Sequence, residues 1–179
     1  MNKVKIATVW LSGCAGCHMS LLDIDETLLD IADRIEFVRS PVVDLKEFPA
    51  DGMDVTIVEG AVANEEHLEI LHEVREKSKL VIALGDCAVT GNIPSMRNNR
   101  IPPQELLERV YGKERTVNGT LPTEVVPPLL DRVRPVHEVI PVDIWLHGCP
   151  PPAGVIGKAI LALLDGKMPE LVGRELKFG

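Results

Sequence analysis

Short β-rich segments alternate with longer helical segments along this chain of 179 residues, and no other sequence feature limits the possible folds as strongly. Runs of apolar and β-branched residues predict five strands, which span Lys3 to Trp10, Glu36 to Val43, Val55 to Glu59, Leu80 to Gly85 and Asp143 to His147. Strands that alternate with helices form a parallel sheet wrapped by those helices. The sequence therefore predicts an α/β fold with an open parallel sheet and helices on both faces.

Three segments show the apolar periodicity of helices. The first lies between the first two strands, where the pattern predicts one amphipathic helix from Met19 to Ile35. The second runs from Asn64 to Lys77, with Asn64 as its N-cap. The third covers Ala153 to Leu164.

The stretch from Ile93 to Pro141 differs from the rest because it is rich in proline and has only a short helical pattern, from Gln104 to Tyr111. We expect a long surface excursion, and excursions of this length usually serve a function. The chain has about the length of one domain, and 45% of its residues are hydrophobic. We therefore expect residues 1–179 to form a single domain.

Charge and cysteine content limit the partners and the compartment. The formal net charge of −8 would repel nucleic acid and anionic membranes, so protein or small-molecule partners are favoured. No apolar run approaches the roughly 18 residues of a spanning helix, because Lys158 interrupts the best candidate. Four cysteines in an acidic chain without a signal-peptide pattern favour a reducing compartment, and we expect a cytoplasmic protein.

All four cysteines lie just beyond the ends of predicted strands. Cys14 and Cys17 follow the first strand, Cys87 follows the fourth and Cys149 follows the fifth. The carboxyl ends of parallel strands share one edge of the sheet, and such folds bind their ligands there. We therefore expect the four thiols to converge at this edge as metal ligands.

Four converging thiolates suit either zinc or an iron–sulfur cluster. Structural zinc sites usually combine two short cysteine pairs, whereas here one pair is joined by two single cysteines, so the spacing favours a cluster while zinc remains an alternative. A thioredoxin-like redox pair at Cys14 and Cys17 is a further alternative. That alternative leaves Cys87 and Cys149 without a role.

Further candidates surround the cysteines. As residues that contact the bound group we single out Gly13, Gly16, Glu59, Gly85, Gly148 and Pro150. Glycines allow the backbone to come close and to direct amide N–H groups at sulfur. Glu59 ends an apolar strand and is a candidate for hydrogen bonding or proton handling, with capping of the next loop as the alternative. His18 and His147 flank cysteines. Each could donate a hydrogen bond to the site, or could simply occupy a polar position in the structure without a role at the site.

Four segments, in this order, resemble the small subunit of NiFe hydrogenases: Leu11 to Ser20, Val58 to Val62, Ala83 to Asn92 and Gly148 to Pro151. The same superfamily includes the 20 kDa-type subunit of NADH:quinone oxidoreductase. That subunit normally has two adjacent cysteines where this chain has Cys14 and Cys17 spaced apart, so the spacing favours the hydrogenase branch.

The resemblance implies a flavodoxin-like domain that holds one 4Fe-4S cluster on Cys14, Cys17, Cys87 and Cys149. It further implies an electron-transfer subunit, which takes electrons from the NiFe centre of a separate large subunit. Because the chain has no other cysteines, it looks like the short delta type found in soluble NAD-reducing enzymes, whose iron–sulfur and flavin diaphorase subunits pass electrons to NAD.

The resemblance assigns no catalytic residue to this chain. A NiFe site needs two C-x-x-C pairs and the sequence contains one, so oxidoreductase activity would belong to the assembled complex. A flavodoxin-like sheet alone gives no reason to expect bound FMN.

Overall fold

Five parallel strands form the central sheet of the structure, a computed structural model that describes residues 3–177. Their order is β2-β1-β3-β5-β7. The strands are β1 (Val4–Trp10), β2 (Ile35–Arg39), β3 (Met53–Glu59), β5 (Ser78–Leu84) and β7 (Ile144–Leu146). Each corresponds to a predicted strand. The expected domain also included residues 1, 2, 178 and 179, which lie outside the described residues.

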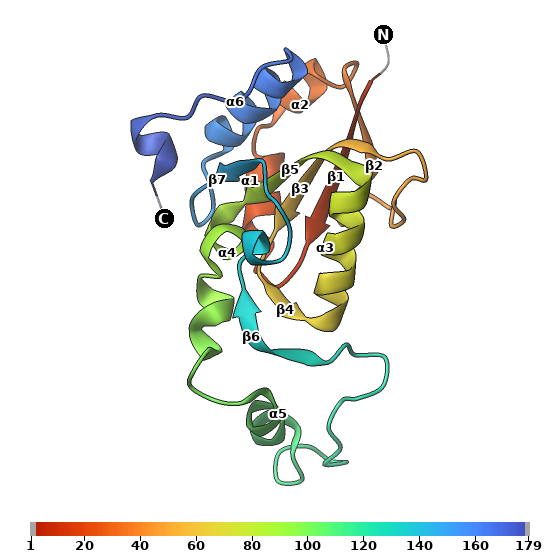
Figure 1. Cartoon of the computed structure of the whole chain (residues 1–179), viewed down its shortest axis with the longest axis vertical. Coiled ribbons are helices and arrows are strands. Elements are labelled where there is room, and N and C mark those ends of the chain that lie inside the picture. The colour runs from red at the N-terminus through yellow and green to blue at the C-terminus, as the bar shows by residue number, and fades with distance from the viewer. Residues whose placement is uncertain (1–2, 178–179) are drawn as a thin grey trace.

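The strand order is the doubly wound arrangement in which helices cover both faces (Figure 1). Because side chains alternate along a strand, the sheet contributes to two separate cores. One core packs Ile57 and Ile82 against α1 (Gly16–Leu22) and α6 (Ala153–Leu164). The other packs neighbouring strand residues against α3 (Glu65–Lys77) and α4 (Gly85–Thr90). The predicted α/β fold with a flavodoxin-like sheet is therefore confirmed.

The predicted helix from Met19 to Ile35 is wrong in one respect, because two short helices replace it. α1 ends at Leu22, and α2 covers Glu26–Asp30. Between them Asp25 adopts a φ of 48°, which a helix does not allow. Aspartate side chains compete for backbone hydrogen bonds and favour such turns. The turn leaves Ile24 buried, close to Gly157 of α6.

The predicted cap of α3 is present. The Asn64 side-chain oxygen accepts the His67 amide N–H at 2.9 Å. Replacing Asn64 with alanine leaves that amide without its acceptor, so we expect the free energy of unfolding to fall by about 1 kcal/mol. Denaturant unfolding measures the change. The matched control is Asn118→Ala in an exposed loop, and equal stability of the two variants would contradict the assigned cap.

The proline-rich excursion begins at the surface but returns to the core. Its first part contains the 3₁₀ helix η1 (Ile93–Arg97) and α5 (Pro103–Tyr111), and α5 lies away from the central sheet (Figure 1). Its last part forms β6 (Leu129–Arg134), which pairs antiparallel with β4 (Val62–Asn64), followed by the 3₁₀ helix η2 (Val136–Glu138).

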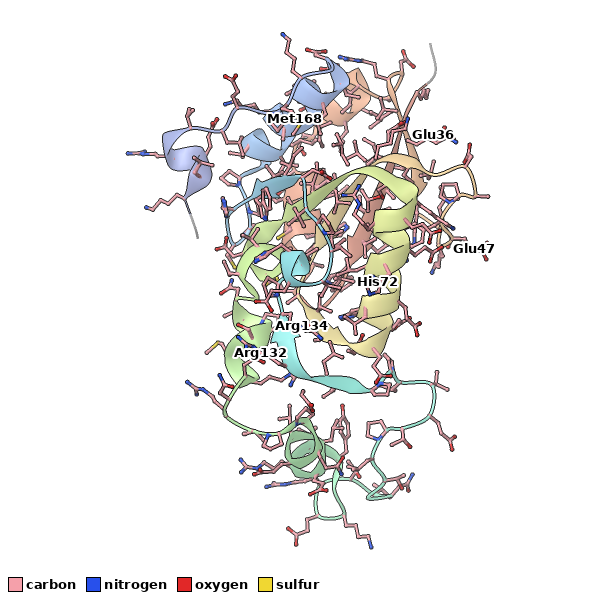
Figure 2. All side chains as sticks on the ribbon, viewed as in Figure 1. Glu36, Glu47, His72, Arg132, Arg134 and Met168 are labelled. Atoms are coloured by element: carbon pink, nitrogen blue, oxygen red, sulfur yellow. The ribbon has the colours of Figure 1, made fainter. Side chains whose placement is uncertain are left out.

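The expectation of a surface excursion up to residue 141 therefore needs correction. Val133, Val136 and Ile140 are buried. In β6, Arg132 directly precedes Val133 in the sequence and Arg134 directly follows it (Figure 2). Both strands of this small sheet are short, so neither has the long apolar run that marks a strand in sequence. No helix among residues 3–177 is both long and apolar enough to cross a membrane.

Candidate metal centre

The strands that precede the cysteines end in one row across the sheet. Trp10 pairs with Glu59, Glu59 with Leu84, and Leu84 with Leu146. Each cysteine-bearing loop leaves the sheet just after one of these residues. The structure thus brings together loops that lie far apart in sequence.

The four thiols lie close enough to influence one another electrostatically. Burial raises the pKa of the Cys17 thiol far above its ordinary value, and the negative charges of Glu59 and of the other three cysteines raise it further. Burial also raises the pKa of Cys87, as do the charges of Cys149 and Cys14. Thiolates gathered in this way would be stabilised by cations between them, and the irons of a cluster could supply that charge.

The chemistry of this donor set fits an iron–sulfur cluster, which is held by four cysteine thiolates. Cys17 is buried and Cys87 half-buried, whereas Cys14 and Cys149 are exposed. Within residues 3–177, no three histidine, cysteine, aspartate or glutamate side chains form a group that could hold a single metal ion.

Three of the thiols accept hydrogen bonds from N–H groups. The Gly16 amide donates to Cys14 Sγ at 3.4 Å, and Asn92 Nδ2 donates to Cys149 Sγ at 3.6 Å. The Ile93 amide donates to Cys87 and opposes the rise in its pKa. Bonds of this kind tune the potential of a bound cluster. The Gly16 amide points at sulfur as expected from the sequence, whereas Asn92 and Ile93 were not singled out.

The other candidate glycines allow close packing rather than donating to sulfur. A Cβ on Gly85 would lie 2.2 Å from Cys17 Sγ, and one on Gly148 would lie 2.6 Å from the Pro151 Cα. Both glycines have positive φ, at 82° and 133°. Gly13 lies against Gly60. Gly85 therefore leaves the space that the Cys17 thiol occupies, whereas Gly13 and Gly148 allow backbone segments to pack closely.

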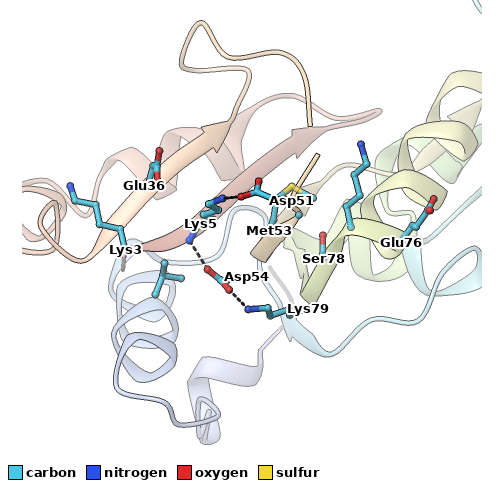
Figure 3. A pocket seen from close by; sticks show the side chains of 12 residues that line it. Lys3, Lys5, Glu36, Asp51, Met53, Asp54, Glu76, Ser78 and Lys79 are labelled. Carbon is cyan, nitrogen blue, oxygen red and sulfur yellow. Dashed lines mark hydrogen bonds and ion pairs between the residues drawn. The ribbon is translucent and has the colours of Figure 1, made fainter. Parts of the chain in front are cut away.

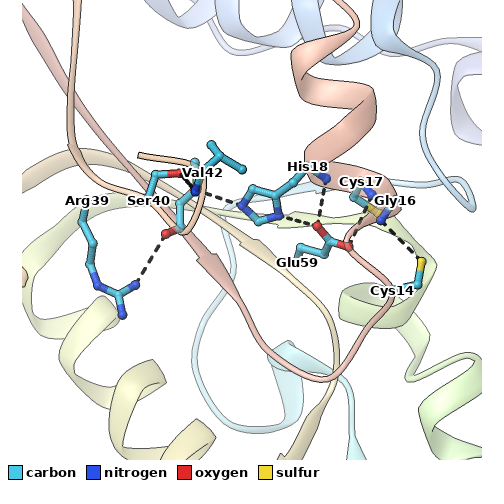
Figure 4. Close-up of polar contacts among 9 residues, drawn as sticks. Cys14, Gly16, Cys17, His18, Arg39, Ser40, Val42 and Glu59 are labelled. Atoms are coloured by element: carbon cyan, nitrogen blue, oxygen red, sulfur yellow. Dashed lines mark hydrogen bonds and ion pairs between the residues drawn. The ribbon is translucent and has the colours of Figure 1, made fainter. Parts of the chain in front are cut away.

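Glu59 fixes the loop that carries the first two cysteines. Glu59 is buried, with Oε2 accepting the His18 amide at 2.8 Å and Oε1 accepting the Cys17 amide at 3.3 Å (Figure 4). The carboxylate thus caps the first turn of α1 from the end of β3. On the sequence alone, the alternatives were hydrogen bonding at the site and capping of the loop that follows Glu59. Its carboxylate accepts from the amides of Cys17 and His18 in α1, beside the site.

His18 extends this contact into a buried chain of hydrogen bonds. Its Nδ1 contacts Glu59 Oε2, and its Nε2 lies 2.9 Å from Thr8 Oγ1, which is in turn 2.6 Å from Ser40 Oγ (Figure 4). All four side chains are at most 2% exposed. Thr8 could have been noticed as a hydroxyl within an apolar strand, whereas the place of Ser40 depends on the pairing of β2 with β1.

The remaining candidates lie in the last cysteine loop. Pro150 is exposed and follows Cys149 through a cis peptide bond. His147 is half-buried and directly precedes Gly148.

A groove lies at the opposite end of the sheet, and four of its charged side chains are paired with one another. It has a volume of about 890 Å³ and includes Lys5, Asp51, Asp54 and Lys79 in its lining (Figure 3). Lys5 pairs with Asp51, and Lys79 pairs with Asp54 at 2.7 Å. Open parallel sheets bind ligands beyond the carboxyl ends of their strands, and this groove lies at the amino ends. The cysteine edge is therefore the better candidate site.

Comparison with known proteins agrees with this fold and site. The family model described as "NADH ubiquinone oxidoreductase, 20 Kd subunit" matches residues 14–163, a range that contains all four cysteines. The chain belongs to this family.

Two curated relatives are hydrogenase subunits. The chain is 45% identical over 170 residues to a subunit of the F420-non-reducing hydrogenase vhu of Methanocaldococcus jannaschii, covering 94% of this chain and 58% of that protein. It is 35% identical over 180 residues to the NAD-reducing hydrogenase HoxS subunit delta of Cupriavidus necator, covering 97% of this chain and 86% of that protein. The chain thus spans somewhat more than half of the first relative and most of the second.

A solved structure agrees over nearly the whole chain. A chain in the crystal structure of an NAD+-reducing [NiFe]-hydrogenase in the H2-reduced state superposes with a TM-score of 0.92 and 37% identity, covering 99% of this chain and 100% of that one. A [NiFeSe]-hydrogenase chain from Dm. baculatum gives a TM-score of 0.63 at 19% identity, covering 98% of this chain and 69% of that one, and shows likeness of fold alone.

Proposed function

We propose that this chain is the electron-transfer small subunit of a cytoplasmic NiFe hydrogenase and holds one 4Fe-4S cluster on Cys14, Cys17, Cys87 and Cys149. The observation that supports the proposal is that all four cysteines follow strand ends at one carboxyl edge of the sheet, near enough for their charges to act on the Cys17 thiol. When bound, the cluster accepts and passes on single electrons. The chain's own residues bind it, direct N–H groups at its sulfur ligands and bury it on one side.

The surface around the cysteines supports a partner that covers this edge. Large apolar side chains that are at least 47% exposed lie beside the cysteine loops, namely Trp10, Met19, Ile93 and Met96. Exposed apolar groups gathered in one place mark protein interfaces. Cys14 and Cys149 are themselves exposed, so a partner there would bring its own redox centre close to the cluster. We propose that this partner is the NiFe-bearing large subunit.

Metal analysis tests the cluster. The chain, purified without oxygen, is expected to contain about four irons and four acid-labile sulfides and to show the EPR signal of a reduced 4Fe-4S cluster. Stoichiometric zinc without sulfide would instead establish the zinc alternative.

The electron acceptor is the finer part of the proposal. Resemblance to the delta subunit of the HoxS enzyme supports diaphorase subunits that pass electrons to NAD. We expect the purified complex to contain nickel and to reduce NAD+ with hydrogen. Quinone reduction by a nickel-free complex would favour the quinone-reducing branch of the superfamily.

A second candidate follows from the identity of 45% to the vhu hydrogenase subunit, which exceeds the 35% to the HoxS delta subunit. The complex would then be a hydrogenase of the F420-non-reducing type. Hydrogen oxidation with an artificial dye, but with neither NAD+ nor F420, would favour this candidate over the NAD-reducing one.

A further inference from the structure

The first turn of α4, which carries Cys87, is joined to the loop that carries Cys149 by a reciprocal pair of hydrogen bonds. The Asp86 amide donates to the Gly148 carbonyl at 2.9 Å, and the Gly148 amide donates back to Asp86 Oδ1 at 2.8 Å. Asp86 and Gly148 directly precede the two cysteines, and the Asp86 residue is only 5% exposed. The separation of these cysteine backbones is therefore set by groups other than the thiols.

A second link joins the same loop to the helix that carries Cys17. Ser20 Oγ donates to the Pro151 carbonyl at 2.5 Å, and Ser20 is also buried. Ser20 lies one turn after Cys17 in α1. The Cys149 loop is thus fixed from two sides, by α4 through Asp86 and by α1 through Ser20.

The Asp86 bond is hard to replace. The Gly148 amide lies in a buried residue, so water cannot readily replace the Asp86 oxygen as its acceptor. Without the Asp86 oxygen, the buried Gly148 amide loses its acceptor, and buried polar groups without partners are unfavourable. The loop is then expected to move, together with the thiol that follows it.

We propose that Asp86 is a positioning residue that sets the separation of Cys87 and Cys149 through its bond to the Gly148 amide. This inference rests on the proposed cluster. Ser20 has the same role for Cys149 relative to Cys17. Neither side chain is among the proposed ligands, so each would act through the loop to which it bonds.

The test measures how fast the complete chain, in the complex with which it purifies, loses iron to a chelator, together with the EPR spectrum after reduction. Loss of a residue that orients a ligand typically weakens metal binding about 10- to 100-fold, and we expect iron loss from Asp86→Ala to accelerate to that extent, with altered g-values. Asp86→Asn retains an oxygen acceptor and should keep the rate and spectrum of the unaltered chain. Asp30→Ala, an exposed change on α2, is the control.

Unchanged iron loss and EPR in Asp86→Ala would overturn the inference, as would equal damage in Asp86→Asn, because the acceptor atom would then not be what matters. If Asp86→Ala does not fold, Ser20→Ala takes its place, and accelerated iron loss in a folded chain supports the inference whereas an unchanged rate opposes it. Absence of iron and sulfide from the unaltered chain would instead contradict the proposed function itself.

Discussion

Replacing Gly85 with alanine is expected to abolish cluster binding, with iron falling from about four per chain to below about one. The added Cβ would lie 2.2 Å from Cys17 Sγ, closer than any two such atoms can approach. Alanine must also adopt the φ of 82° at this position, which costs roughly 1–2 kcal/mol. Either Cys17 or the start of α4 must therefore move. Iron and sulfide analysis measures the loss.

Gly154→Ala is the matched control for this change. Gly154 lies in the first turn of α6, and a Cβ there would meet no atom within 4 Å. Alanine in a helix is favoured over glycine by roughly 0.5–1 kcal/mol, so this variant should be slightly more stable and hold full iron. Full iron in Gly85→Ala would contradict the packing of Cys17 against Gly85.

Cys87→Ser and Cys149→Ser are each expected to lower the iron content as severely as Cys14→Ser or Cys17→Ser does. Each substitution removes one of four thiolate ligands and leaves the other three with an incomplete site. The measurement is iron, zinc and acid-labile sulfide per chain, with the visible spectrum of the oxidised protein. Met96→Ser is the control, since it removes an exposed sulfur from the segment that follows Cys87 without touching a proposed ligand.

This series also separates the alternatives. A thioredoxin-like pair at Cys14 and Cys17 would exchange disulfides without Cys87 and Cys149, so serine at either distant position would leave its activity intact. A cluster spectrum that survives the loss of either distant cysteine would exclude the proposed set of four ligands.

The central sheet could be predicted from sequence because its inner strands β1, β3 and β5 are mostly buried on both faces and therefore form apolar runs. The run from Val55 to Glu59 is an example, and the structure extends it only to Met53. The break at Asp25 could not be predicted, because the apolar periodicity continues through it and the turn is stabilised by burial of Ile24 against another helix. Periodicity alone does not register such tertiary contacts.

The positions of the candidate ligands could also be predicted, because the topology of a parallel sheet determines where its loops meet. The residues that hold those loops could not. Asp86 and Ser20 bond to backbone atoms that lie far away in sequence, and the Glu59 carboxylate reaches amides of α1 across the sheet edge. The sequence signal that could have pointed to Asp86 as such a residue was its position, since it is an acidic residue shortly after the end of an apolar strand and directly before a cysteine.

Strand register determines the level at which each cysteine-bearing segment leaves the sheet, because Trp10, Glu59, Leu84 and Leu146 lie in one row across it. Each strand advances about 3.3 Å per residue, which exceeds the length of a metal–sulfur bond of about 2.3 Å. Inserting a single residue into β5 or β7 would therefore shift one thiol out of bonding reach of the others, and an insertion into β1 would shift two. Changes in chain length are better tolerated in the outlying segment around α5, where no strand register has to be kept.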